Sequence, residues 1–187
     1  MAIISTPAEY DSTPEPADVG MLGWTGDPVL VAASAGLTSG RIVYQRIRIP
    51  NSFTTTGGVL SVGTVGSTLT SGQNLMALLS ANGTRLALST DQTSNFSTGT
   101  GVKQCTWTAT YTGGPGIYYV AVLSVGTTPP LIHRFANTVT ANTFVTTPIS
   151  SLRAIRSSGT ANTTIPASVD WATDGILDGT VYWMGIY

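Results

Sequence analysis

Few residues in this chain are of types that carry out acid–base or nucleophilic chemistry. His133 is the only histidine and Cys105 the only cysteine among 187 residues. Hydrolysis by a nucleophilic triad requires a base that holds the nucleophile and an acid that orients the base. No Gly-x-Ser-x-Gly motif occurs, and His133 lies beside Arg134 shortly after Pro129-Pro130. We therefore interpret His133 as a loop or strand-edge residue and predict no catalytic residue.

Three aspartates, Asp170, Asp174 and Asp178, lie close together in the stretch VDWATDGILDG. Opposed carboxylates would suit a glycosidase such as a wall-degrading depolymerase, and oxygen ligands gathered in loops would suit Ca²⁺. However, Asp174-Gly175 and Asp178-Gly179 are dipeptides typical of turns, and their glycines oppose a helix that would align the three carboxylates. We favour structural turns, with a calcium site that lacks EF-hand spacing as the alternative.

The sequence predicts no cofactor. One cysteine and one histidine do not make a usual zinc site, and neither a Walker loop nor a dinucleotide-binding fingerprint occurs. Cys105 lies in Val102–Tyr111, where apolar residues alternate with threonines, so we expect a buried and inert thiol. Sugars stack on exposed aromatics, but aromatics fill cores first. The candidates by type are Tyr118, Tyr119, Trp171, Tyr182, Trp183 and Tyr187.

The composition argues against nucleic-acid binding and membrane insertion. Charged residues make up 9% of the chain, against about 25% in average globular domains. The net charge is −1, and the basic groups Arg41/Arg46/Arg48 and Arg153/Arg156 are too sparse for a basic patch. The longest apolar run, near Ile117–Leu123, is far shorter than the roughly 20 residues that span a bilayer. No signal sequence is evident, and we expect a soluble protein.

The clearest structural signal is a β-hairpin over Leu69–Asp91. Two apolar-rich runs, Asn74–Ser80 and Thr84–Ser89, flank Ala81-Asn82-Gly83, and Asn-Gly favours a tight reversal between antiparallel strands. Period-2 alternation places Leu86 and Leu88 on one face and Arg85, Ala87 and Ser89 on the other. Leu75, Leu78, Leu86 and Leu88 are therefore predicted core residues.

Several further strands are predicted, and no long helix. They are Arg41–Ile49, Val59–Val65, Val102–Tyr111, Ile117–Val125 as a central buried strand, Leu131–Phe135, Ile149–Arg156 and Val181–Tyr187. Asp91–Gly101 is expected to be a long loop, and 137–147 is ambiguous. Eight or nine strands separated by turn signals indicate an all-β, two-sheet antiparallel β-sandwich of jelly-roll type. We assign 1–20, which is rich in proline and acids, to an extended N-terminal arm and 21–187 to a single sandwich domain.

Four stretches, taken in their order, resemble one known family. They are GMLGWTGDP (Gly20–Pro28), LTSGRIVYQRIRIP (Leu37–Pro50), LTSGQNLMALLSANGTRLALSTDQ (Leu69–Gln92) and GIYYVAVL (Gly116–Leu123). The set is similar to the minor tail or virion surface proteins of tailed bacteriophages that infect actinobacteria. The stretches cover well under half of the chain. Many members of that family are longer, because their β-domain is joined to other modules.

The resemblance implies a non-enzymatic virion protein, a minor tail or tail-tip protein that contacts the host surface. A capsid (head) decoration or head-fibre protein anchored by its N-terminal arm is one alternative, and a carbohydrate-binding module is another. The expected partners are other virion proteins (tail or major capsid), further copies of the chain, with a trimer as one closed arrangement, and a host cell-wall glycan. The expected location is the virion, after synthesis in the host cytoplasm. No functional residue is carried over from the family.

Overall fold

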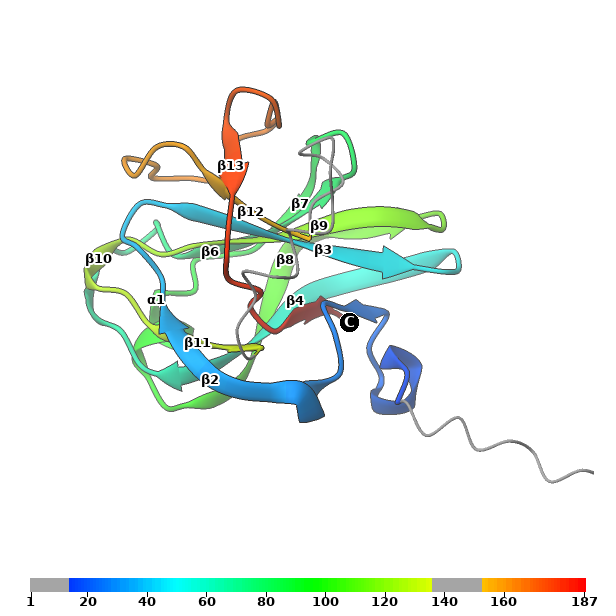
Figure 1. Ribbon diagram of the computed structural model, residues 1–187, viewed down its shortest axis with the longest axis horizontal. Helices are drawn as coiled ribbons and strands as arrows, with labels where there is room; N and C mark the ends of the chain where they lie inside the picture. The colour runs from blue at the N-terminus through cyan, green and yellow to red at the C-terminus, as the bar shows by residue number, and fades with distance from the viewer. Residues whose placement is uncertain (1–13, 136–152) are drawn as a thin grey trace, which may run out of the picture.

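The chain folds into two stacked antiparallel β-sheets. The computed structural model describes residues 14–135 and 153–187, and Figure 1 shows its strands surrounding a common interior. Each of the two main sheets has six strands, and a small third sheet has two. The predicted all-β antiparallel sandwich is therefore confirmed. Within the described residues, no helix is both long enough and apolar enough to cross a membrane.

The two main sheets draw their strands from along the whole described chain. Sheet 1 contains β1 (Gly23–Trp24), β2 (Val31–Gly36), β4 (Phe53–Thr64), β8 (Gly101–Gly113), β11 (Leu131–Phe135) and β14 (Met184–Ile186). Sheet 2 contains β3 (Ile42–Ile49), β6 (Leu75–Ser80), β7 (Arg85–Leu88), β9 (Gly116–Leu123), β12 (Ala154–Ser157) and β13 (Gly175–Leu177). The small sheet pairs β5 (Ser67–Leu69) with β10 (Gly126–Thr128).

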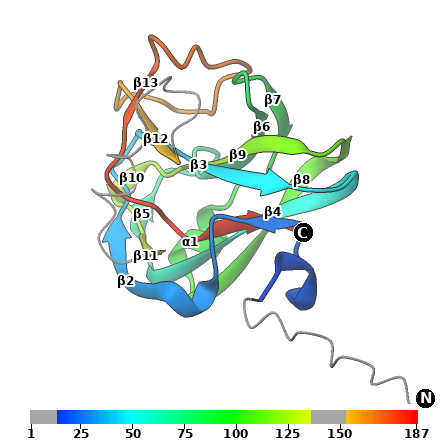
Figure 2. The ribbon, with the colours of Figure 1, turned by 45° about the vertical axis from the view of Figure 1, so that its right-hand side comes forward.

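Eight of these strands form nested antiparallel pairs. The pair β6–β7 is innermost, followed outward along the chain by β4–β8, β3–β9 and β1–β14. Successive pairs alternate between sheet 2 and sheet 1. Two further pairings, β9 with β6 and β14 with β4, join the pairs within each sheet. Figure 2 shows the result as two layers, with β3 and β9 above β4, β14 and β1.

The predicted hairpin is the innermost pair. The backbone N–H of Gly83 donates to the Ser80 carbonyl at 3.0 Å, and the N–H of Ser80 donates to the Thr84 carbonyl at 2.8 Å. Gly83 has a φ of 88°, in the region that glycine adopts without steric cost. The predicted Asn-Gly turn is therefore confirmed.

One detail of the hairpin differs from the strict alternation predicted. Leu78 pairs with Ala87 while Leu79 pairs with Arg85, so Leu86 is the extra residue of a β-bulge. As a result, Leu86 packs on the cluster between the sheets, and Leu88 packs on the opposite face of sheet 2. The prediction that these two leucines share a face is wrong, because a bulge shifts the period-2 pattern by one residue.

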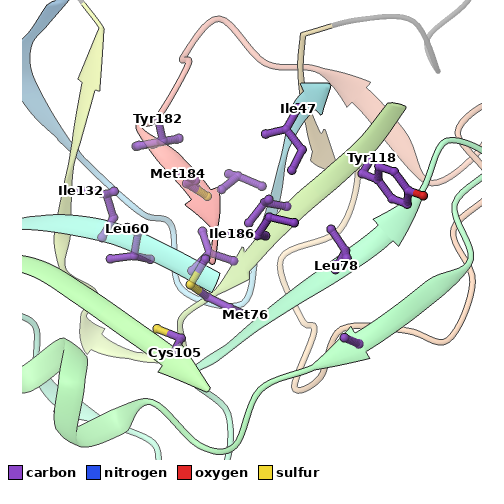
Figure 3. Packing of buried hydrophobic residues seen from close by; sticks show 14 of the residues in the cluster. Ile47, Leu60, Met76, Leu78, Cys105, Tyr118, Ile132, Tyr182, Met184 and Ile186 are labelled. Atoms are coloured by element: carbon purple, nitrogen blue, oxygen red, sulfur yellow. The ribbon is translucent and has the colours of Figure 1, made fainter. Parts of the chain in front are cut away.

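Three apolar clusters occur among the described residues, one between the two sheets and one on the outer face of each. The largest lies between the sheets and includes Ile47, Leu60, Met76, Leu78 and Ile186 (Figure 3). A second covers the outer face of sheet 2, where Ile165, Val169 and Trp171 close over the strands. A third lies on the outer face of sheet 1 and includes Val59, Val181 and Trp183. Strand β9 is accordingly buried, as predicted, because it lies centrally in a sheet that is covered on both sides.

Short helices occupy two segments that were predicted to be irregular. Pro16–Val19 forms a 3-10 helix, η1, instead of extended chain, and the Asp18 carboxylate accepts the Glu15 N–H at 2.9 Å. Thr93–Ser97 forms α1 within the predicted loop, where its buried Phe96 contributes to the core. A second 3-10 helix, η2 (Pro28–Leu30), follows Asp27.

Some sequence predictions lie outside the described residues. These are the arm over 1–13, the ambiguous segment 137–147 and the first part of the strand predicted from Ile149 to Arg156. Fourteen strands occur in the described residues, more than the eight or nine predicted. Several of them are only two or three residues long, too short to show a pattern in the sequence.

The turn at the hairpin tip gives a direct stability prediction. A Cβ on Gly83 would collide with the Val169 carbonyl oxygen, and the positive φ adds strain. We expect Gly83→Ala to lower the free energy of unfolding by about 2 kcal/mol or more, measured by urea denaturation. Gly72→Ala is the matched control: Gly72 also has a positive φ, 79°, but among the described residues no atom beyond its two chain neighbours lies within 4 Å of the place that its Cβ would take. This control should lose only about 1 kcal/mol, and equal losses would contradict the clash.

Candidate functional site

A hollow of about 280 Å³ on the outer face of sheet 1 is a candidate site. Ser61 on β4 lies between Leu60 and Val62, which face the core, so its side chain points away from the core. The hollow is mainly apolar, with two polar side chains. Its lining residues are Pro28, Val31, Ser61, Val102, His133 and Trp183.

The two polar side chains in the hollow contact each other. His133 Nδ1 and Ser61 Oγ are 2.9 Å apart, within hydrogen-bond distance. His133 lies on β11, which is hydrogen-bonded to β2 on one side and to β4 on the other. The prediction of a loop or strand-edge position is therefore wrong: β11 is an interior strand of sheet 1. The backbone N–H of Trp183 also donates to the backbone carbonyl of His133 at 2.9 Å, which further fixes β11 at this position.

Ser61 and His133 are the polar pair among the residues that line the hollow. A triad needs a carboxylate to orient the imidazole ring, and within 14–135 and 153–187 no carboxylate hydrogen-bonds to His133. The hollow offers apolar walls and one hydrogen-bonding pair, a combination that accepts an apolar group carrying one polar atom. Sequence reasoning missed Ser61, because it lies 72 positions from His133 and only the pairing of β4 with β11 brings the two together.

The three aspartates act on the local backbone. Asp174 Oδ2 accepts the Asp170 N–H at 3.0 Å, Asp170 Oδ1 accepts the Ala172 N–H at 3.0 Å, and Asp178 Oδ1 accepts the Thr180 N–H at 3.0 Å. Their interpretation as turn residues is confirmed by these bonds. Asp178 is buried, and burial raises its pKa although Thr180, Arg156 and Arg41 act in the opposite direction. Among the described residues, no three His, Cys, Asp or Glu side chains are grouped to hold a metal ion.

Arg153 and Arg156, the second pair of basic residues noted in the sequence, lie within the fold. Arg153 Nη2 donates to the Thr25 carbonyl at 2.6 Å, and its guanidinium carbon lies 5.6 Å from the centre of the Phe135 ring. Arg156 belongs to β12, between β3 and β13. These contacts tie the segment after residue 152 to the start of the sandwich and to β11.

The candidate sugar-stacking aromatics belong mostly to the core. Trp171 packs edge-on to Tyr44, with ring centres 5.2 Å apart, and against Tyr119 at 4.8 Å. Tyr118, Tyr182 and Trp183 are also buried, and Tyr187 is half-buried. The expectation that most of these rings fill the core is confirmed. None of the six belongs to an exposed row of the kind that a sugar-binding face would need.

Comparisons with known proteins give no family assignment. No protein-family model matches the chain, and no curated protein matches it.

The thiol of Cys105 gives a prediction about reactivity. Its side chain is 0% exposed, and burial raises its pKa to about 12. Because the thiolate is the reactive form, we expect no reaction with a disulfide reagent such as DTNB at pH 8 over the time in which urea-unfolded protein reacts fully. Thr110→Cys, at an exposed position of β8, is the control and should react at once. Rapid stoichiometric labelling of the native wild-type chain would show that Cys105 is accessible.

The buried thiol of Cys105 and the buried tyrosine hydroxyl groups also predict a loss of stability at alkaline pH. Burial raises the pKa of Cys105 from 9.0 to about 12, and the pKa values of Tyr119 and Tyr182 from 10.0 to about 12. Between about pH 9 and 12 the unfolded chain releases protons that the folded chain retains. The free energy of unfolding should therefore fall as the pH rises through this window, as measured by urea titrations at pH 7, 9 and 10.5. Cys105→Ala should flatten the first part of the decline, and an increase in stability with pH would refute the assignment.

Proposed function

We propose that this protein is a structural, non-catalytic component of a tailed bacteriophage virion, in the tail or at its tip. The observation that carries the proposal is where the family-like stretches lie in the fold. Leu37–Pro50 contains β3, Leu69–Gln92 contains β6 and β7, and Gly116–Leu123 lies within β9. These four strands are consecutive neighbours in sheet 2, in the order β3-β9-β6-β7. Three of the four stretches, far apart in the sequence, thus form one continuous sheet, whereas the fourth, Gly20–Pro28, contains β1 of sheet 1. This adjacency of three stretches supports a resemblance that belongs to a folded unit.

We also propose that the sandwich is a jelly roll with added strands. A jelly roll consists of eight strands in two Greek keys, and it recurs in virion proteins. The nested pairs β6–β7, β4–β8, β3–β9 and β1–β14, which alternate between the sheets, follow that plan. In this scheme β2, β11, β12 and β13 extend the two sheets beyond the eight-stranded unit.

The proposed partners follow from the virion role. We propose contacts with other virion proteins through the N-terminal arm, and assembly with further copies of the chain, a trimer being one closed form. The tail-tip location would bring the protein to the host surface. The carbohydrate-binding alternative is less favoured, because five of its six candidate aromatics are buried.

Immunogold labelling tests the location directly. Antibody raised against the full chain, applied to intact particles of the phage that encodes it, should label the tail or tail tip. Antibody pre-absorbed with the purified chain is the control and should leave particles unlabelled. Labelling of heads would replace the tail proposal with the capsid-decoration alternative. Particles without label, together with no trace of the chain in denatured purified virions, would rule out both.

A further inference from the structure

The buried side-chain atoms that lack a hydrogen-bond partner belong to one side of the sandwich. Among the described residues they are Arg41 Nε, Gln45 Oε1, Arg134 Nε and Arg156 Nε. Buried polar groups in folded proteins are nearly always paired, so each exception calls for an explanation. Three of these four atoms belong to guanidinium groups, which donate hydrogen bonds, carry a positive charge and cannot accept. The strand register shows how the three arginines come together.

Two of the arginines face the space between the sheets from sheet 2. Arg156 of β12 pairs with Val43 of β3, and Ala154 pairs with Gln45. Val43 belongs to the cluster between the sheets, and residues paired across a ladder lie on the same face. Arg156 therefore points inward. Arg41 directly precedes β3 and lies two residues from Val43, which makes it a diagonal neighbour of Arg156 on that face.

The third arginine, Arg134, faces the same space from sheet 1. Ile132, two residues before it on β11, belongs to the cluster between the sheets, so alternation points Arg134 inward as well. Arg134 also forms a β-bridge with Tyr182, another member of that cluster. Burial and, less strongly, Asp178 raise the pKa of Tyr182 to about 12, whereas Arg134 and Arg156 act in the opposite direction. One arginine from each sheet therefore lies near the same tyrosine hydroxyl group.

The positive charge of this cluster exceeds the negative charge beside it. Among the described residues, Asp178 is the carboxylate that charge effects connect to these arginines: burial raises its pKa, and Arg156 and Arg41 lower it. Asp178 lies just after β13, in the chain that runs down this side of the molecule to β14 (Figure 2). Three guanidinium groups against one carboxylate leave an excess of two positive charges. The sequence of 136–152, which follows β11, contains no Asp or Glu that could balance them.

We propose that Arg41, Arg134 and Arg156 bind a doubly charged oxyanion, hydrogenphosphate or sulfate, at the side of the sandwich that carries β11 and β12. Guanidinium groups donate in a planar fork that matches the oxygen atoms of such ions. A dianion balances the two excess charges, and an unbalanced buried charge is costly. All three side chains are partly exposed, and Ile176, which pairs with Arg156 on β13, is 36% exposed, so the ion reaches the site from solvent. The site does not depend on the proposed virion role.

Isothermal titration calorimetry of the full 187-residue chain with sodium phosphate tests the proposal. In a sodium chloride buffer at pH 7.5, phosphate should bind at one site with a Kd of about 1 mM or lower, and sodium sulfate should compete with it. Arg41→Gln and Arg156→Gln should each weaken the binding about tenfold or more. Arg48→Gln, at an exposed position of β3 on the opposite face of sheet 2, is the matched control and should bind phosphate like the wild type.

The unfolding midpoint provides a second readout. Because phosphate and sulfate stabilise proteins in general, the informative quantity is the difference between variants in about 20 mM phosphate and in chloride of equal ionic strength. The wild type and Arg48→Gln should gain stability from phosphate, and Arg41→Gln should gain clearly less. Arg41 lies outside β3, so Arg41→Gln carries the test if Arg156→Gln does not fold. A wild-type chain without saturable phosphate binding would overturn the proposal, as would equal binding by Arg41→Gln and Arg48→Gln.

Discussion

The turn at Asn82-Gly83 is the constraint on which most of this structure depends. It closes β6 on β7, and each wider pair of the nested set forms outside that first reversal. The same turn also holds a distant part of the chain. The Val169 N–H donates to the Gly83 carbonyl at 3.0 Å, and Trp171 Nε1 donates to the Ala81 carbonyl at 2.9 Å. One glycine conformation therefore fixes both the hairpin and the segment that covers the outer face of sheet 2.

The hollow on sheet 1 results from the length of β4. This strand has twelve residues, and one of its edges pairs with β8 along most of that length. Its other edge is shared, first by β14 near Val59 and then by β11 near Val62. At the change from one partner strand to the other, Ser61 Oγ lies within hydrogen-bond distance of His133 Nδ1. Trp183, just before β14, lines one side of the hollow. The site thus depends on a change of partner strand, and a local sequence motif does not encode such a change.

The parts of the fold that the sequence predicts are those governed by local chemistry. Asn82-Gly83 specifies its own turn, the alternation around Cys105 and Trp107 specifies the buried face of β8, and the apolar run at Ile117–Leu123 specifies a strand covered on both sides. The bulge at Leu86 was missed because it depends on how β7 meets β6. The Ser61–His133 contact was missed for a related reason: it depends on pairing between strands that are distant in the sequence.

The scarcity of charge in this chain bears on the proposed function. Several of the arginines and acids present are used in internal contacts: Arg153 binds the Thr25 carbonyl, and Asp178 is buried against the Thr180 N–H. On β8, by contrast, the exposed residues Thr106, Thr108 and Thr110 carry hydroxyl groups. Charge keeps protein surfaces apart through mutual repulsion, and a surface with few charges loses that barrier. Sheet faces that carry hydroxyl groups and few charges are therefore compatible with the proposed virion role, in which neighbouring proteins would cover part of the surface.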